Sequence, residues 1–344
     1  MNRIKVLVID DSALMRQLLS DILRADPQVE VVGTAGDPYA AWDKIKICSP
    51  DVLTLDVEMP RMDGLTFLEK LMAHKPMPVV MVSSLTEANC ETTFRALELG
   101  AVDFVSKPKY DMASGTIALA DELVAKVKAA GRAKVRKHVA KIASKNDRVA
   151  GYDATHKVIA IGTSTGGCEA LATVLGAMPA DAPAVVAVIH MPEGFTKSYA
   201  ARLDRLSAMR VSEARDGDRV LPGHVLLAPG NFHLSLVRNG AFTTVRIHGG
   251  APVNRHRPAV DVMFESAARE LGANCVGALL TGMGDDGARG LLALRRAGAR
   301  TLAQDEASCV VFGMPKEAIA LGAAEQIVPL DTVAYHLLRC AQAK

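Results

Sequence analysis

Short apolar runs alternate with amphipathic stretches along the first part of the chain, up to about residue 128. The apolar runs are rich in β-branched residues and read IKVLVID, VEVVGTA, VLTLD, VVMVS and DFVSK. Runs of this composition are typical of strands, and the longer helix-like stretches between them are typical of crossover helices. The pattern therefore predicts a doubly wound α/β domain over residues 1–128, a (βα)5 unit with five parallel strands.

The same rhythm returns in the second part of the chain. The runs KVIAIGTS, AVVAVIH, HVLLAP, CVGALLTG and ARTLAQD predict a second doubly wound, mostly parallel α/β domain over residues 154–344. Within it, HLSLV and AFTTVRIH flank a turn at 238–240 and predict an antiparallel hairpin beside that sheet. Between the domains, residues 131–148 are rich in Lys and Arg, which indicates a solvated helix end and a basic linker over 129–153.

Composition narrows the class of protein. A chain of 344 residues with 49% apolar and 23% charged residues is long enough for two ordinary hydrophobic cores. A formal charge of +2 gives no general affinity for polyanions, so we expect no nucleic-acid partner. No apolar run approaches the roughly 18 residues of a membrane span, so we expect no membrane insertion. Six scattered cysteines indicate reduced thiols and a cytoplasmic location.

Acidic residues end two of the predicted strands in the first domain. Asp10 and Asp11 follow the first strand, and Asp56 ends the third. The carboxyl ends of parallel strands share one edge of the sheet, so we expect these carboxylates to meet there. Three carboxylates repel one another unless a hard divalent cation lies among them, and this favours Mg²⁺. The alternative is helix capping, but it accounts for one acid rather than three.

Two further residues complete the first predicted site. Ser83 ends the fourth strand and Lys107 follows the fifth. A hydroxyl and an ammonium beside a carboxylate and Mg²⁺ are the groups that a phosphorylated carboxylate needs around it.

Residues 1–125 resemble the receiver domain of bacterial two-component response regulators. The similarity lies in the Asp10-Asp11 pair, in LTLDVEMPRMDG around Asp56, in VMVSS around Ser83, and in FVSKP at 104–108. The resemblance implies that Asp56 accepts a phosphoryl group from a histidine kinase. It also implies that Asp10, Asp11, Asp56 and the backbone carbonyl of Glu58 bind Mg²⁺, and that Ser83 and Phe104 form the switch pair.

The second domain contains a glycine-rich turn after its first strand, in KVIAIGTSTGG. One interpretation is a dinucleotide-binding loop, but Ser164 stands where that motif has its middle glycine, and no acidic residue ends the next strand. The other interpretation is a nucleophile elbow, Gly162-x-Ser164-x-Gly166, which exposes Ser164 on a sharp turn between strand and helix.

A histidine and an Asp pair favour the elbow. His190 follows AVVAVI directly and is predicted at the same sheet edge as Ser164. Asp285 and Asp286 follow CVGALLTGMG, so either carboxylate is a candidate to orient the imidazole, and the other is a candidate helix cap. The residues alone leave that choice open.

Residues 155–342 resemble the catalytic domain of the CheB family of chemotaxis protein-glutamate methylesterases. The motifs GTSTGG, VIHMP, NRHRPAVDVMF and TGMGDDG carry the similarity. The resemblance implies that Ser164, His190 and Asp286 form the triad, and that the backbone at Thr165 and Met283 forms the oxyanion hole. It implies a cofactor-free esterase that demethylates chemoreceptor glutamates and deamidates receptor glutamines, is activated by phosphorylation, and is restrained by its unphosphorylated receiver.

Two other functions compete with this interpretation. A DNA-binding response regulator with a basic arm at 131–148 is disfavoured, because the output half has an α/β pattern and the basic run lacks aromatics. A nucleotide-binding output domain would use the glycine turn, and a NAD or ATP binding assay separates it from an esterase. We expect a monomer whose partners are chemoreceptors and a histidine kinase.

Overall fold

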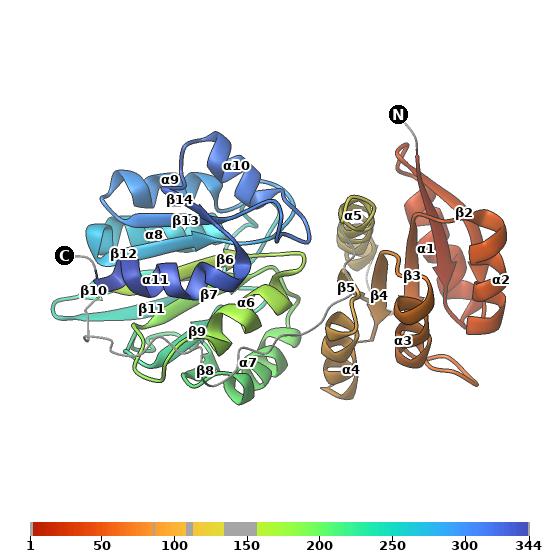
Figure 1. The fold of residues 1–344 in the computed structure, drawn as a ribbon, viewed down its shortest axis with the longest axis horizontal. Helices are drawn as coiled ribbons and strands as arrows, with labels where there is room; N and C mark the ends of the chain where they lie inside the picture. Colours follow the sequence, from red (N-terminus) through yellow and green to blue (C-terminus); the bar gives the residue numbers. More distant parts are fainter. Residues whose placement is uncertain (1–2, 85–86, 108–112, 134–156, 343–344) are drawn as a thin grey trace. The chain divides into compact units, whose positions relative to one another are not determined.

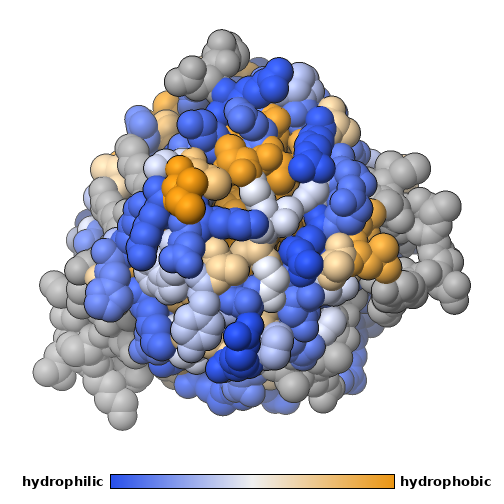
Figure 2. Space-filling view, turned by 90° about the vertical axis from the view of Figure 1, so that its right-hand side faces the viewer, coloured by the Kyte–Doolittle hydropathy of each residue, from blue (hydrophilic) through white to orange (hydrophobic). Residues whose placement is uncertain are grey.

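The computed structural model describes residues 3–84, 87–107, 113–133 and 157–342. They form two compact units, one on each side of the segment 134–156 (Figure 1). Most of the linker predicted at 129–153, and Pro108 of the FVSKP motif, lie outside the described residues. No described helix is both long enough and apolar enough to cross a bilayer. The face of the first unit that Figure 2 shows is mainly hydrophilic, with small, separate apolar patches.

The first unit is a five-stranded parallel sheet in the order β2-β1-β3-β4-β5, which confirms the predicted (βα)5 fold. Its strands lie within the five predicted runs: β1 (Ile4–Ile9), β2 (Val29–Ala35), β3 (Val52–Asp56), β4 (Val79–Ser83) and β5 (Asp103–Ser106). The crossover helices are α1 (Ala13–Arg24), α2 (Pro38–Cys48), α3 (Gly64–His74) and α4 (Glu87–Glu98), and α5 (Ala113–Ala130) follows the last strand. Every residue of β3 and β4 is buried, which explains why these strands are apolar on both faces.

The second unit is a seven-stranded parallel sheet in the order β14-β13-β12-β6-β7-β9-β8. Five strands match predicted runs: β6 (Val158–Thr163), β7 (Val185–Ile189), β9 (His224–Leu227), β12 (Cys275–Leu279) and β13 (Arg300–Gln304). The two edge strands, β8 (Arg210–Glu213) and β14 (Gln326–Val328), were not predicted. Both are short and partly exposed, so neither has the apolar run of a central strand.

Helices cover both faces of this second sheet (Figure 1). On one side, α8 (Val260–Leu271) packs against α9 (Ala288–Arg296), which contacts α10 (Met314–Ala320). On the other, α6 (Gly167–Gly176) contacts α7 (Phe195–Leu206) and α11 (Val333–Gln342). The described part of this unit also has short 3₁₀ helices at Gly272–Asn274 and Leu330–Thr332.

The predicted hairpin is present as β10 (His233–Asn239) and β11 (Phe242–His248), and it forms a separate two-stranded sheet. Asn239 pairs with Phe242, so β10 runs two residues further than predicted and the turn lies at 240–241 rather than 238–240. Buried side chains of the hairpin, among them Leu234, Leu236 and Val245, join the core beneath α8. This burial fixes which face of the hairpin points inward.

In both sheets the strand order reverses at a point inside the sheet. In the first unit β1 lies between β2 and β3, and in the second β6 lies between β7 and β12. Loops leaving such neighbouring strands diverge to opposite faces, which opens a crevice at the carboxyl ends of the strands. The predicted acids follow β1 and β3. The predicted triad residues follow β6, β7 and β12.

Candidate active site and phosphorylation site

Ser164 lies in the turn between β6 and α6. Its N–H donates to the carbonyl of Thr281 over 3.0 Å, and its own carbonyl accepts from the N–H of Gly167 over 2.7 Å. Gly166 has a φ of +77°, and a Cβ there would lie 2.6 Å from Cβ of Val310. The turn therefore needs glycine at this position, and it leaves Ser164 partly exposed between buried neighbours.

The loop after β12 lies directly against this turn. A Cβ at Gly282 would be 2.9 Å from Cβ of Ser164. The N–H of Gly282 donates to Val311, and its carbonyl accepts from the N–H groups of Gly313 and Met314, over 2.9 to 3.0 Å. Met283, the next residue, is thereby held beside the Ser164 turn. The assignment of Thr165 and Met283 as oxyanion donors remains a prediction.

His190 and Asp286 form a close pair at the same sheet edge. Nε2 of His190 lies 2.7 Å from Oδ2 of Asp286, and the two side chains are only 6% and 1% exposed. The backbone N–H of His190 donates to Thr163, the residue before Ser164. The other ring nitrogen, Nδ1, is buried and has no hydrogen bond to any described residue. It is the nitrogen left for a proton transfer.

Of the two candidate acids, only Asp286 contacts His190. Asp285 is exposed, and its backbone carbonyl accepts from Ala288 at the start of α9. The Asp286 carboxylate accepts the backbone N–H groups of Val260 and Asp261 over 2.6 and 3.1 Å. It therefore caps the N-terminus of α8, whose own N-cap residue makes no side-chain bond. The predicted cap of α9 by one of these Asp side chains is wrong, because Gly287 occupies the N-cap of α9.

The environment of Asp286 favours its charged form. Burial by itself would raise the pKa of this carboxyl group. The hydrogen bond and charge of His190, with further hydrogen bonds from Asn254 and Val260, outweigh burial and lower the pKa to about 2. The side chain is therefore an anion at neutral pH, as an acid that orients an imidazole must be.

Three residues beside the pair were not assigned a role from sequence. Nδ2 of Asn254 lies 2.8 Å from both Asp286 and Asp261, and the ring of His256 stacks on that of His190 with centroids 3.6 Å apart. Asn254 and Asp286 are separated by 32 residues, so no periodic pattern could link them. The one signal in the sequence was the NRHRPAVDVMF motif, which contains Asn254, His256 and Asp261.

In the first unit, the three predicted acids do meet. Carboxylate oxygens of Asp10, Asp11 and Asp56 all lie within 4.8 Å of one another. Asp10 and Asp56 are buried and Asp11 is exposed. The alternative that an Asp before Ser12 caps the first helix is wrong, because the side chain of Ser12 itself caps α1. Three clustered carboxylates are the donor set that Mg²⁺ prefers, so these residues fit the metal site that the sequence predicts.

Lys107 joins this cluster, as predicted. Its Nζ lies 3.0 Å from Asp10 and 2.7 Å from Asp56. Burial by itself would lower the pKa of Lys107, but Asp56 and Asp10 outweigh it and raise the pKa. Burial raises the pKa of Asp56 to about 6, in spite of its bond to Lys107. One ammonium thus leaves excess negative charge at the cluster, which a bound cation would offset.

The predicted switch residues lie on neighbouring strands. Ser83 is fully buried at the end of β4, and Phe104 on β5 is 3% exposed. Lys126 of α5 lies 5.0 Å from the centre of the Phe104 ring and donates to the Phe104 carbonyl over 2.6 Å. Their role as a switch pair stays a prediction, but the structure shows the Phe104 ring in an inward, buried position.

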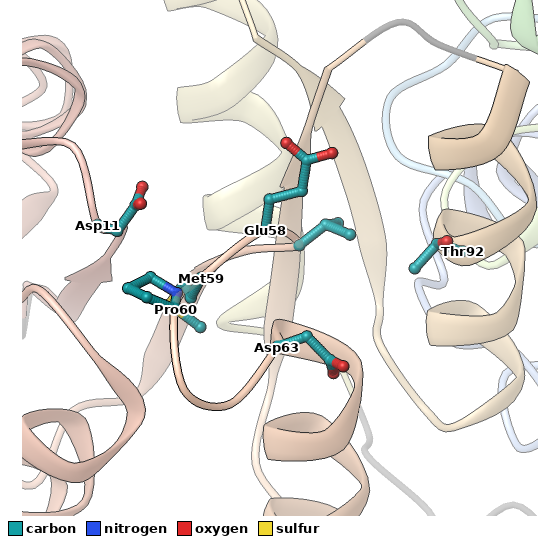
Figure 3. A pocket seen from close by; sticks show the side chains of 7 residues that line it. Asp11, Glu58, Met59, Pro60, Asp63 and Thr92 are labelled. Atoms are coloured by element: carbon teal, nitrogen blue, oxygen red, sulfur yellow. The ribbon is translucent and has the colours of Figure 1, made fainter.

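An open pocket of about 540 Å³ adjoins the acidic cluster (Figure 3). It is lined by Asp11, Val57, Glu58, Met59, Pro60, Asp63 and Thr92. Glu58 follows Asp56 by two residues, and its N–H donates to Asp56 over 3.3 Å. The use of the Glu58 carbonyl as a metal ligand stays a prediction.

Comparison with known proteins agrees with this organisation. The family model for the CheB methylesterase matches residues 159–337, and that for the response regulator receiver domain matches residues 6–114. The "protein-glutamate methylesterase/protein-glutamine glutaminase 2" of Pseudomonas aeruginosa is 58% identical over 338 residues, covering 98% of this chain and 97% of that protein. A Bordetella bronchiseptica protein with the same name but without the number is 56% identical over 344 residues, with 98% and 97% coverage.

A solved structure resembles the second unit. The crystal structure of the Thermotoga maritima CheB methylesterase catalytic domain aligns with a TM-score of 0.52 and 40% sequence identity. The match covers 53% of this chain and 97% of that domain. These matches agree with the fold of both units and with the Ser, His and Asp residues at one edge of the second sheet. The chain therefore belongs to the CheB methylesterase family, and it joins a receiver domain to a methylesterase domain.

Proposed function

We propose that this protein hydrolyses glutamate methyl esters on bacterial chemoreceptors, with Ser164, His190 and Asp286 as a catalytic triad. The observation that carries the proposal is the 2.7 Å contact between His190 Nε2 and Asp286, next to the Ser164 turn. A buried carboxylate on one ring nitrogen fixes the tautomer and leaves the other nitrogen to act as base. The names of the aligned relatives give the same reaction.

The geometry supports the following mechanism. Oγ of Ser164 attacks the ester carbonyl carbon while Nδ1 of His190 takes the hydroxyl proton. The tetrahedral intermediate then breaks its bond to the methoxy oxygen, and His190 returns the proton to give methanol. A water molecule attacks the resulting acyl-enzyme with the same base, which frees the glutamate carboxylate and restores Ser164. Asp286 stays ionised throughout and stabilises the imidazolium.

The oxyanion of the tetrahedral intermediate needs hydrogen-bond donors close to Ser164. We assign this role to the backbone N–H groups of Thr165 and Met283. The close approach of Gly282 to Ser164 supports the assignment, because it holds Met283 beside the nucleophile. Backbone donors fixed in this way stabilise the developing charge without reorganisation during the reaction.

Glutamine deamidation follows from the same steps with ammonia as the leaving group. The amide carbonyl is attacked by Ser164, and His190 protonates the departing nitrogen. Both reactions end in a glutamate side chain, so they produce the same receptor surface. No cofactor takes part in either reaction.

The receiver unit regulates this activity. Asp56 accepts a phosphoryl group from a chemotaxis histidine kinase, Lys107 pairs with its oxygens, and Ser83 and Phe104 respond as the switch. Asp10, Asp11, Asp56 and the carbonyl of Glu58 would hold Mg²⁺, which would neutralise charge between the carboxylate and the incoming phosphoryl oxygens. Phosphorylation raises the rate of demethylation, as adaptation in a chemosensory pathway requires.

The test is methanol release from methyl-labelled receptor membranes, with and without a small phosphodonor. Ser164→Ala should abolish nearly all release in both conditions, because binding and the oxyanion hole retain only a small part of triad catalysis. Ser198→Ala, a serine in α7, is the matched control and should keep wild-type activity. A Ser164→Ala protein with more than about a tenth of the wild-type kcat would place the nucleophile elsewhere.

A further inference from the structure

A tight turn stands beside the His190–Asp286 pair. The backbones of Val253 and His256 exchange two hydrogen bonds of 3.0 and 2.8 Å, and the two residues between them, Asn254 and Arg255, have φ values of 50° and 69°. Left-handed backbone at both central positions is the geometry of a type I′ turn, which usually contains glycine. Here neither residue is glycine. Arg255 is exposed, whereas the Asn254 side chain makes contacts that offset the backbone strain at its position.

Asn254 connects two buried carboxylates. Its Nδ2 lies 2.8 Å from Oδ1 of Asp286 and 2.8 Å from Oδ2 of Asp261. Its Oδ1 accepts from Nη2 of Arg289 over 2.7 Å. Because an arginine can only donate, the amide oxygen must face Arg289 and the NH₂ group must face the two carboxylates. The orientation of the amide is therefore fixed by chemistry, with one hydrogen available to each acid.

This contact completes the set of donors on Asp286. Oδ2 receives His190 Nε2 and the N–H of Val260, at 2.7 and 2.6 Å. Oδ1 receives Asn254 and the N–H of Asp261, and the latter bond is longer, at 3.1 Å. Without the Asn254 side chain, Oδ1 would keep only that long bond, and the negative charges of Asp261 and Asp286 would face each other without a bridging donor. The carboxylate that orients His190 would then be less firmly held.

His256 restrains the other member of the pair. Its ring lies parallel to that of His190, with centroids 3.6 Å apart and an interplanar angle of 11°. The hydrogen bond at Nε2 fixes the direction of one N–H, but it permits rotation of the ring about that bond. A flat group against the ring face removes this rotation, and so sets where Nδ1 points. Both constraints are needed to aim Nδ1 at the Ser164 hydroxyl.

We propose that the 253–256 turn positions the acid and the base of the triad, with Asn254 orienting Asp286 and His256 setting the ring plane of His190. The inference rests on the proposed function, because it assumes that these two residues act on Ser164. Asn254 and His256 are positioning residues in this scheme, since they act through Asp286 and His190 and need not touch the substrate.

Paired variants of the full-length, phosphorylated protein test each contact. Asn254→Gly keeps the left-handed backbone and removes the amide, whereas Asn254→Asp keeps the shape and cannot donate to either acid. His256→Ala removes the stacked ring, and His256→Phe restores a flat ring without ring nitrogens. The control is Arg255→Gly, which changes an exposed side chain in the same turn and tolerates the same φ.

For methanol release from methylated receptor membranes, Asn254→Gly, Asn254→Asp and His256→Ala should each lower kcat about 10- to 100-fold, the usual effect of losing a group that orients a site residue. KM should change by less than about twofold, because no substrate contact is lost. His256→Phe should recover most of the kcat lost in His256→Ala. Arg255→Gly should keep the wild-type kcat.

A spectroscopic measurement separates positioning from folding. The proton between His190 and Asp286 should give a downfield ¹H NMR signal that is absent in His190→Ala, retained in His256→Phe, and weakened or shifted in Asn254→Gly. Any one of these outcomes would overturn the inference: a raised KM with an unchanged kcat, equal loss in His256→Phe and His256→Ala, an unchanged NMR signal in Asn254→Gly, or equal loss in Arg255→Gly.

The Ser164→Ala variant keeps the two proposals distinguishable. If it is inactive while Asn254→Gly and His256→Ala match the wild type, the triad stands and only the positioning role fails. If Ser164→Ala retains activity, the proposed function itself fails.

Discussion

In the proposed mechanism, the Asp286 carboxylate serves the fold as well as the reaction. It accepts two backbone N–H groups at the start of α8 and also holds His190. A helix N-terminus carries partial positive charge, so a carboxylate placed there is stabilised in its ionised form. One side chain therefore links the end of β12, the end of β7 and the start of α8. Its loss should affect both activity and stability.

The first prediction compares the two neighbouring acids. Asp286→Asn should lower kcat for methanol release by about 10³- to 10⁴-fold, because an amide directed at Nε2 favours the wrong imidazole tautomer. Asp285→Asn should stay within about twofold of the wild type, since Asp285 is exposed. Steady-state kinetics on both variants is the measurement, and the reverse ranking would overturn the assignment of Asp286.

The second prediction concerns acid stability. The pKa of Asp286 is lowered to about 2 in the folded state from an ordinary value of 3.8. A carboxyl group whose pKa is lowered by folding stabilises the folded protein at pH values above its unfolded-state pKa. This stabilisation is lost as the pH falls through its folded-state pKa. The shift corresponds to roughly 2 kcal/mol of unfolding free energy that disappears between about pH 4 and pH 2.

Denaturant unfolding of the wild type and of Asp286→Asn at several pH values measures this contribution. The difference in unfolding free energy between the two proteins should shrink by about 2 kcal/mol as the pH falls from about 5 towards 2. A difference that does not depend on pH in this range would mean that Asp286 titrates normally in the folded protein.

The third prediction concerns phosphorylation at Asp56. Labelling by a small phosphodonor such as acetyl phosphate should require Mg²⁺ and should vanish in Asp56→Asn, because the cluster of Asp10, Asp11 and Asp56 needs a cation to admit an anionic phosphoryl group. The control is Asp51→Asn, an exposed acid just before β3. Equal labelling in the presence of EDTA would contradict the metal site.

At the scale of elements, the two chemical sites have the same origin. In each sheet the residues lie in loops that leave neighbouring strands at the point where the strand order reverses. Tight turns at these strand ends bring the loops close together. In the Ser164 turn, both Gly166 and Gly282 leave no space for a side chain.

The fourth prediction tests this turn. Gly166→Ala introduces both an unfavourable φ and a Cβ that would lie 2.6 Å from Cβ of Val310. Gly240→Ala, in the hairpin turn, has a comparable φ of +60° but no atom within 4 Å of the added Cβ. The hairpin variant should lose about 1 kcal/mol through backbone strain alone, with normal activity.

Gly166→Ala should lose more stability than Gly240→Ala. It should also lose most of its esterase activity, because the clash displaces Ser164. Thermal unfolding and methanol release measure the two effects. Equal stability loss in the two variants would show that the contact with Val310 relaxes without cost.

At the scale of the whole molecule, two compact units carry separate chemistry on one chain. Phosphorylation can activate the esterase only by the difference in its affinity for the restrained and active states. A fragment that lacks the receiver has no restrained state of this kind.

The fifth prediction follows from this coupling. A fragment beginning near residue 147 should be more active than the unphosphorylated full chain and should not respond to a phosphodonor. Asp56→Asn in the full chain should remain at the low basal rate. A folded fragment that is no more active than the unphosphorylated protein would favour positive activation, or delivery to the receptor, over restraint by the receiver.

Local sequence determined most of the secondary structure and the placement of the chemical residues. Central strands of a parallel sheet are buried on both faces, so β1, β3, β6 and β7 appear as continuous apolar runs. Residues that end such runs lie at one edge of the sheet, and for this reason the sequence by itself identifies Asp56, Ser164 and His190 as site residues. The edge strands β8 and β14 lacked this signal because they are short and partly exposed.

Tertiary structure alone decided the finer chemistry. The choice between Asp285 and Asp286 depends on a hydrogen bond across 96 residues, and the contact of Asn254 with Asp286 spans 32. The contact of Nε2 with Asp286, which leaves Nδ1 without a hydrogen bond to any described residue, depends on the rotation of a single ring. These contacts join loops that leave different strands, so their geometry is set by packing of distant segments. No pattern among neighbouring residues encodes it.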